Sequence, residues 1–184
     1  NLSKLISDLT AMISLKAQAK NLIFDIDVDN SLPVHLYGDD IRIRQILTNL
    51  LSNAIKYTKE GRVELSVKGE LKDNTLTLYC CVTDTGIGIK EEHLTNLFEE
   101  YKRIEDGSNH HIEGTGLGLN ITMRLLNLMG SKLQVQSEYG KGSSFTVSIP
   151  QKIINDTPIG KIDFDSAAES VASYKHECDY IAPD

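Results

Sequence analysis

The sequence predicts an α/β sandwich: a mixed, largely antiparallel sheet covered on one face by helices. Stretches with apolar residues at alternate positions, typical of strands, are interleaved with stretches of helical spacing. At least two pairs of these strands are joined by short turns, and such hairpins disfavour a purely parallel, doubly wound sheet. The 184 residues are enough for one domain with a substantial core.

The first third of the chain begins with a helix, because the apolar residues of segment 2–19 recur at helical spacing. Alternation of apolar and polar residues then predicts strands over 22–28 and 34–37. A long helix follows, with Asp39 or Asp40 as its N-terminal cap and an apolar stripe along one side.

The middle of the chain is predicted to form an antiparallel hairpin over residues 62–82, since two alternating runs flank a polar turn. A glycine-bearing turn over 84–88 and a short helix over 91–97 come next. Residues 99–116 have no period and mix glycine, polar residues and two histidines. We therefore expect a long loop there, and long loops in compact domains are frequently functional lids.

The last ordered region is predicted to contain a helix over 117–129 and a hairpin that Pro150 closes. Residues 151–184 differ, with seven acidic residues against three lysines and no sustained apolar period. We therefore expect a domain over 1–150 and an acidic linker or tail over 151–184. The chain lacks an initiator methionine and starts inside a helical pattern, so we expect a fragment of a larger protein.

Composition limits the classes of function. The formal net charge is −7, which argues against binding to nucleic acid or to an anionic membrane. The three cysteines have neither disulfide-framework nor zinc-site spacing. Thiols that stay reduced are typical of the cytosol, so a cytoplasmic location is expected. No apolar run is long enough to span a membrane, and an inner-membrane anchor in the parent protein is left open.

Three groups of residues suggest phosphate and nucleotide chemistry. Asn49, Asn53 and Lys56 share one helix face, where amide oxygens suit Mg²⁺ and an ammonium suits phosphate. Alone, they also fit an ordinary solvated face. Arg103 could neutralise a terminal phosphate, although a surface arginine is the simpler interpretation of that residue alone.

The other two groups are glycine-rich. Asp84-Thr-Gly86-Ile-Gly88 places a carboxylate at the end of an apolar strand, where it could accept a hydrogen bond from an amino group such as that of adenine, and its glycines would let the backbone approach a ligand. Residues 114–118 open a helix, whose N–H groups and dipole favour phosphate. Their spacing matches neither a dinucleotide fingerprint nor a Walker loop, and each group alone fits a plain turn or flexible loop.

Taken together and in order, these segments resemble the ATP-binding catalytic domain of sensor histidine kinases, of the hybrid type. The resemblance covers about residues 1–150. Its motifs are the N box at 40–58, the G1 box at 84–89, the F box at 97–103 and the G2 box at 114–119. It implies the histidine-kinase/gyrase-type ATPase fold, with an ATP lid between the short helix and the G2-box helix.

The resemblance also implies ATP and Mg²⁺ as cofactors and a role for each residue. Asn53 would ligate Mg²⁺ with Asn49 beside it, Lys56 and Tyr57 would contact phosphate or the nucleotide edge, and Asp84 would bind the adenine amino group. The implied catalytic residues are Asn49, Asn53, Lys56 and Arg103. The other implied nucleotide-binding residues are Gly86, Gly88, Ile89, Phe98, Gly114, Thr115, Gly116, Leu117, Gly118 and Leu119.

The implied reaction is transfer of the γ-phosphoryl group to a histidine on a separate dimerisation domain. Gyrase and heat-shock chaperones carry a glutamate base four residues before the metal asparagine, but this sequence has Asn49 there, and an amide cannot accept a proton at neutral pH. No histidine of the chain stands in the family's acceptor setting, so the acceptor domain is expected to be absent from this fragment.

The expected partners are that dimerisation domain and the receiver domain of a response regulator. Residues 180–184 resemble the approach to a receiver domain fused at the C-terminal side. Two alternatives remain open: a nucleotide-binding regulatory module, or pseudokinase, without phosphotransfer, and a serine kinase of the same superfamily.

Overall fold

In the computed structural model of the chain, the structure describes residues 1–72, 75–94 and 117–162. Within these ranges the helices are α1 (Leu2–Gln18), α2 (Asp40–Tyr57), α3 (Glu91–Leu94) and α4 (Leu117–Leu128). The strands are β1 (Ile23–Val28), β2 (Pro33–Tyr37), β3 (Arg62–Lys72), β4 (Thr75–Asp84), β5 (Lys132–Glu138) and β6 (Gly142–Pro158).

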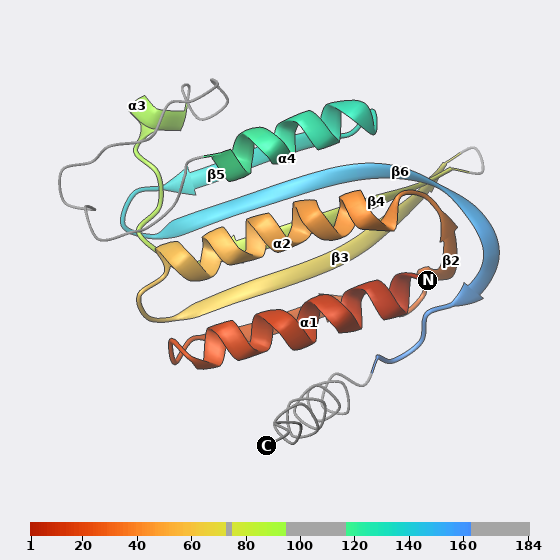
Figure 1. Ribbon diagram of the computed structural model, residues 1–184, viewed down its shortest axis with the longest axis horizontal. Helices are drawn as coiled ribbons and strands as arrows, with labels where there is room; N and C mark the ends of the chain where they lie inside the picture. Colours follow the sequence, from red (N-terminus) through yellow and green to blue (C-terminus); the bar gives the residue numbers. More distant parts are fainter. Residues whose placement is uncertain (73–74, 95–116, 163–184) are drawn as a thin grey trace, which may run out of the picture.

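These strands form one sheet in the order β1-β3-β4-β6-β2, and β5 also pairs with β6. Only the β1–β3 pair is parallel among the described strands; the remaining pairs are antiparallel. Helices α1, α2 and α4 lie over the same face of the sheet (Figure 1). The predicted fold class, a mixed and largely antiparallel sheet under one layer of helices, is therefore confirmed.

Each element follows from its local sequence. The side chain of Asp39 accepts a hydrogen bond from the Arg42 amide at 2.9 Å, so Asp39 rather than Asp40 is the N-cap of α2. Burial alternates along β3 and β4, because successive strand side chains point to opposite faces. The fully buried aliphatic side chains of these strands and of α1 and α2 form the core: Ile6, Leu9, Ile13, Ile46, Leu47, Leu50, Leu51, Val63, Leu65 and Leu78.

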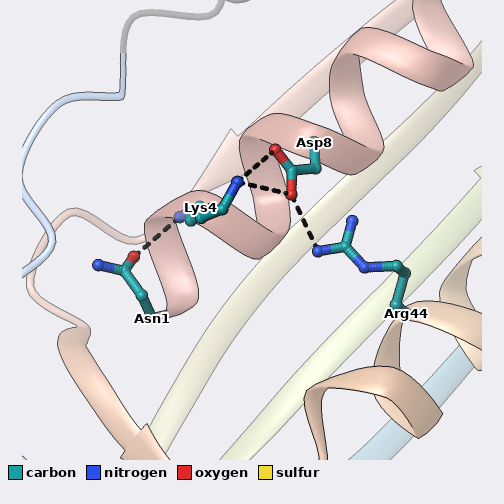
Figure 2. A network of polar contacts seen from close by, with 4 residues as sticks. All are labelled: Asn1, Lys4, Asp8 and Arg44. Carbon is teal, nitrogen blue, oxygen red and sulfur yellow. Dashed lines mark hydrogen bonds and ion pairs between the residues drawn. The ribbon is translucent and has the colours of Figure 1, made fainter.

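A polar network joins α1 to α2 at the edge of this core (Figure 2). The Asp8 carboxylate forms ion pairs with Arg44 Nη2 at 3.0 Å and with Lys4 Nζ at 3.3 Å. The backbone amide of Lys4 donates a hydrogen bond to Asn1 Oδ1 at 2.9 Å. Because these charged side chains remain partly exposed, the pairs orient the helices and add little to stability.

The pairing of the last hairpin ends at Ser148, close to the predicted end at Pro150, but its second strand does not end there. Strand β6 continues to Pro158, and its second half pairs with β2. Pro150 lies between Ser148, the last residue that pairs with β5, and Lys152, the first that pairs with β2. A residue without an N–H group is tolerated at such a gap in the ladder. The side-chain amide of Gln151 also donates to the Pro150 carbonyl at 2.7 Å.

Three further predictions concern the short helix after β4, the cysteines and the absence of a membrane-spanning segment. Helix α3 is described only to Leu94, so the last part of the helix predicted at 91–97 lies outside the described residues. Cys80 and Cys81 are free thiols, and burial raises the pKa of Cys80 to about 12. None of the described helices has the length and apolar character needed to cross a membrane.

Candidate functional site

The second half of α2 carries the polar stripe that the sequence singled out. Asn49, Asn53 and Lys56 are each half-buried, while the opposite side of the helix is buried in the core. Asn53 has no hydrogen-bond partner among the described side chains. Lys56 Nζ lies 3.4 Å from the hydroxyl of Tyr57 and 4.9 Å from the centre of its ring. The stripe therefore presents an amide and an ammonium that can still bind a ligand.

The loop after β4 is packed against the end of α2. The Ile87 amide donates to the carbonyl of Tyr57 at 3.2 Å. A Cβ added to Gly86 would lie 2.5 Å from that same carbonyl oxygen and 2.9 Å from the Thr58 hydroxyl. Glycine at 86 therefore permits a close approach to α2 itself, whereas the sequence suggested an approach to a ligand.

The same loop is held on its other side by the turn between β5 and β6. Gly88 has φ +66°, and an added Cβ would overlap the carbonyl of Glu138. The Gly140 amide donates to Ile87 O at 2.8 Å, and the Ile89 amide donates to Ser137 Oγ at 2.8 Å. The predicted G1-box residues are thus fixed between two elements that are far apart in the sequence.

Asp84 lies at the centre of this arrangement. It is the last residue of β4, continues the strand's buried register, and is 6% exposed. Burial raises the pKa of its carboxyl, while hydrogen bonds from the backbone of Gly86, at 2.8 Å, and of Ser143 act in the opposite direction. No described cation forms an ion pair with it. Such a carboxylate is suited to accept a hydrogen bond from a ligand's amino group.

Helix α4 closes the arrangement on the side of Asn49. The Asn49 side-chain amide donates to Thr122 Oγ1 at 2.8 Å. A Cβ added to Gly118 would overlap Asn49 Oδ1. Leu119 packs against the hydrophobic core, half-buried. The structure therefore brings the N-box residues into contact with the start of the G2-box helix.

Several sequence-predicted residues lie outside the described part of the chain: Phe98, Arg103, Gly114, Thr115 and Gly116. The same holds for the side chain of Leu117, although its backbone begins α4. The lid expected between the short helix and the G2-box helix is likewise outside it.

Sequence reasoning missed Thr122, Ser137 and Thr58, which hold the candidate residues in place. Thr58 is fully buried and its hydroxyl donates to Ala54 O at 2.7 Å. Gly118 and Thr122 are one helical turn apart, so the sequence does indicate that they share a face of α4. It does not indicate their partner, Asn49, which lies on a helix about seventy residues away.

The donor set is compatible with a hard divalent cation. The Asn53 amide oxygen is a hard ligand, and Mg²⁺ commonly takes few protein ligands because it keeps waters and phosphate oxygens. No cluster of three or more His, Cys, Asp or Glu residues occurs among the described positions.

Comparisons with known proteins agree with this geometry. Residues 38–153 match the family model described as histidine kinase-, DNA gyrase B- and HSP90-like ATPase. Hybrid signal transduction histidine kinase B of Dictyostelium discoideum is 43% identical over 155 residues, which is 84% of this chain and 8% of that protein. The sensor ArcB of Escherichia coli is 39% identical over 145 residues, 78% of this chain and 18% of that protein.

Solved structures show the same fold. Full-length ShkA in complex with AMPPNP has a TM-score of 0.70 at 28% identity, covering 84% of this chain and 31% of that one. The catalytic domain of the histidine kinase ThkA has a TM-score of 0.63 at 26% identity, covering 83% of this chain and 95% of that one. The chain thus spans a small part of its curated relatives and nearly all of an isolated catalytic domain. It belongs to the histidine kinase-, DNA gyrase B- and HSP90-like ATPase family.

Proposed function

We propose that this chain is the Mg·ATP-binding catalytic domain of a two-component histidine kinase, which donates the γ-phosphoryl group to a histidine supplied by a dimerisation domain. The observation that carries the proposal is Asp84, a buried carboxylate with no described cation beside it, at the end of β4, whose following loop packs against the end of α2. The relatives named histidine kinases, and the AMPPNP complex of ShkA, support it.

The Asp84 end of the site would bind the base. Its carboxylate accepts a hydrogen bond from the Gly86 amide and retains further acceptor capacity. The exocyclic amino group of adenine is a donor that fits, whereas guanine presents a carbonyl at the equivalent position. Gly88 and Ile89 shape the loop around this carboxylate.

The α2 stripe would bind the phosphates. Asn53 would ligate Mg²⁺, which neutralises phosphate charge when it is bound. Lys56 supplies a positive charge one turn further along the same helix face, with Tyr57 next to it. Asn49 cannot act as a general base, so bound ATP would be held for transfer to another acceptor rather than hydrolysed efficiently.

The proposal includes the residues outside the described ranges. Arg103 would reach the terminal phosphate, Phe98 would anchor the lid, and Gly114 and Gly116 would pass the lid over the phosphates. The receiver domain of a response regulator would be the partner that follows the dimerisation domain. A cytoplasmic location of this chain would suit that partnership.

A thermal-shift titration tests the nucleotide site. ATP, ADP and GTP are added to the chain with and without Mg²⁺, for the natural sequence and for Asp84→Asn. At a ligand concentration about 100-fold above Kd, binding stabilises by about 2.7 kcal/mol and raises Tm by about 5–10 °C. We expect adenine-selective shifts that Asp84→Asn abolishes. The absence of any shift with every nucleotide would overturn the proposal.

Phosphotransfer needs a second experiment. The chain is mixed with a histidine-kinase dimerisation domain and γ-labelled ATP, and the labelled residue is identified by its stability. Phosphohistidine is labile to acid, whereas phosphoserine is stable to acid. Acid-stable label would identify a serine kinase, and nucleotide binding without any transfer to the acceptor domain would identify a regulatory module.

A further inference from the structure

The contact between α2 and α4 is made by a buried hydroxyl. Thr122, on α4, is 1% exposed, and its Oγ1 accepts a hydrogen bond from Asn49 Nδ2 at 2.8 Å. The Thr122 side of this contact is closed to solvent, whereas Asn49 is half-buried. Removing the hydroxyl would take from the Asn49 amide its hydrogen-bond partner on α4.

The other end of the Asn49 amide is also held. Gly118 lies one helical turn before Thr122 on the same face of α4. An added Cβ there would overlap Asn49 Oδ1, so the amide oxygen lies directly against the backbone of Gly118. The Asn49 amide is therefore held on one side by a hydrogen bond and on the other by close packing.

We propose that Thr122 is a positioning residue of the nucleotide site, acting through Asn49, and that Gly118 is the spacer that allows this contact. The inference rests on the proposed function and adds to it a residue outside the recognised motifs. Asn49 lies one turn from Asn53 and two turns from Lys56 on the same helix face. Fixing its amide therefore sets the polar surface that would face Mg²⁺ and the phosphates, and leaves the Asp84 end untouched.

Because Thr122 would act on the phosphate end of the site and not on the Asp84 end, its loss should affect a ligand with phosphates more than one without them. Thr122→Val keeps the shape of the side chain and removes the hydroxyl. We expect it to weaken Mg·ATP binding by about five- to tenfold, and to leave adenosine binding within about twofold of the natural chain, since adenosine has no phosphate. Thr122→Ser restores the acceptor and should restore Mg·ATP affinity.

Thr10→Val is the matched control. Thr10 is also a buried helical threonine, 3% exposed, but its hydroxyl has no hydrogen-bond partner in the described structure. It lies on α1, in the opposite flank of the helix layer. We expect Thr10→Val to change neither ligand's affinity, because the same chemical change there breaks no bond to the site.

The measurement is calorimetric titration with Mg·ATP and an NMR titration with adenosine, at a temperature at which melting curves show each variant fully folded. Thr122→Ala replaces Thr122→Val if the latter does not fold. Unchanged Mg·ATP affinity in the hydroxyl-free variant would overturn the inference, and so would equal losses for Mg·ATP and adenosine.

The two proposals fail in different ways. If the natural chain binds neither ligand, the proposed function fails and this inference fails with it. If the natural chain binds both, and Asp84→Asn weakens both, the proposed function stands. The response of Thr122→Val and its rescue by Thr122→Ser then decide the inference alone.

Discussion

The carboxylate of Asp84 carries its negative charge in a place from which water is almost excluded. Burial raises its pKa above the ordinary value of 3.8, and the backbone hydrogen bonds offset only part of that effect. The folded state therefore holds a proton more tightly than the unfolded chain does. A charged Asp84 therefore reduces the stability of the nucleotide-free protein, a cost that the proposed binding role would explain.

The sign of this effect can be measured. Because the folded pKa is the higher one, the Asp84 contribution to the free energy of unfolding falls as pH rises from about 3.8 through the folded pKa, and stays low above it. We expect Asp84→Asn, without nucleotide, to be at least as stable as the natural chain near pH 7. The stability difference should shrink toward about pH 4. Chemical unfolding at several pH values measures it, and a pH-independent difference would contradict the prediction.

Single residues differ in how far the sequence reveals them. Asp84 could be placed because it continues the alternation of buried residues along β4, so its burial follows from strand geometry. Gly86 and Gly88 were recognised as glycines that allow close approach, but the groups they approach, Tyr57 and Glu138, depend on long-range packing. Thr122 could not be found, because its partner is set by the relative placement of two helices.

At the scale of elements, the end of α2 is completed by a side chain from outside the helix. Lys20, which follows α1, donates from Nζ to the carbonyls of Ile55 at 2.9 Å and Lys56 at 3.1 Å. The last carbonyls of a helix have no partner within it, and a cation there also complements the helix dipole. The turn that carries Lys56 is thus supported from α1.

We expect Lys20→Met to lower the free energy of unfolding by about 1 kcal/mol. Lys16→Met is the matched control, because Lys16 also reaches α2 but, among the described residues, bonds only the hydroxyl of Ser52, at 3.3 Å. It should change stability by less than about 0.5 kcal/mol. Urea unfolding of the three proteins compares them, and equal losses would show that capping of α2 is not the cause.

Helices and strands were the part of the fold best predicted from sequence. Helix α2 begins where its N-cap indicated, because capping is a local interaction. The strand order is not local. Alternation of apolar and polar residues identifies a strand but does not say which strand it pairs with. It could therefore not predict the parallel pairing of β1 with β3, or the pairing of β2 with the second half of β6.

At the scale of the whole molecule, the sheet is completed by residues that the sequence assigned to a tail. The part of β6 beyond Pro150 is the strand partner of β2 in the described structure, and the Ile159 amide donates to Leu32 O at 2.6 Å. Acidic and small residues after Pro158 hid this, because they dominate the composition of 151–184, whereas residues 151–158 hold one acidic residue. The division into a domain at 1–150 and a linker therefore remains a proposal whose boundary can be tested.

Two truncations test it. A chain ending after Ile162 keeps every described contact of β2 and should unfold within about 0.5 kcal/mol of the full chain. A chain ending after Pro150 loses the partner of β2 and should lose about 3 kcal/mol or more. Thermal melting and limited proteolysis in β2 compare them. Equal stability of the two would show that the domain does end at Pro150.

The glycines around the site differ in what surrounds them, and this has a genetic consequence. At Gly86, Gly88 and Gly142 an added methyl group would meet the backbone of another segment, which every amino acid shares. A loss of function caused by alanine there has no second-site suppressor at the contacted residue. At Gly118 the obstacle is the side chain of Asn49. A smaller residue at 49 would therefore restore the packing of Gly118→Ala but would remove the Asn49 amide, so a screen for restored folding, rather than for activity, would recover such pairs from that position alone among the four.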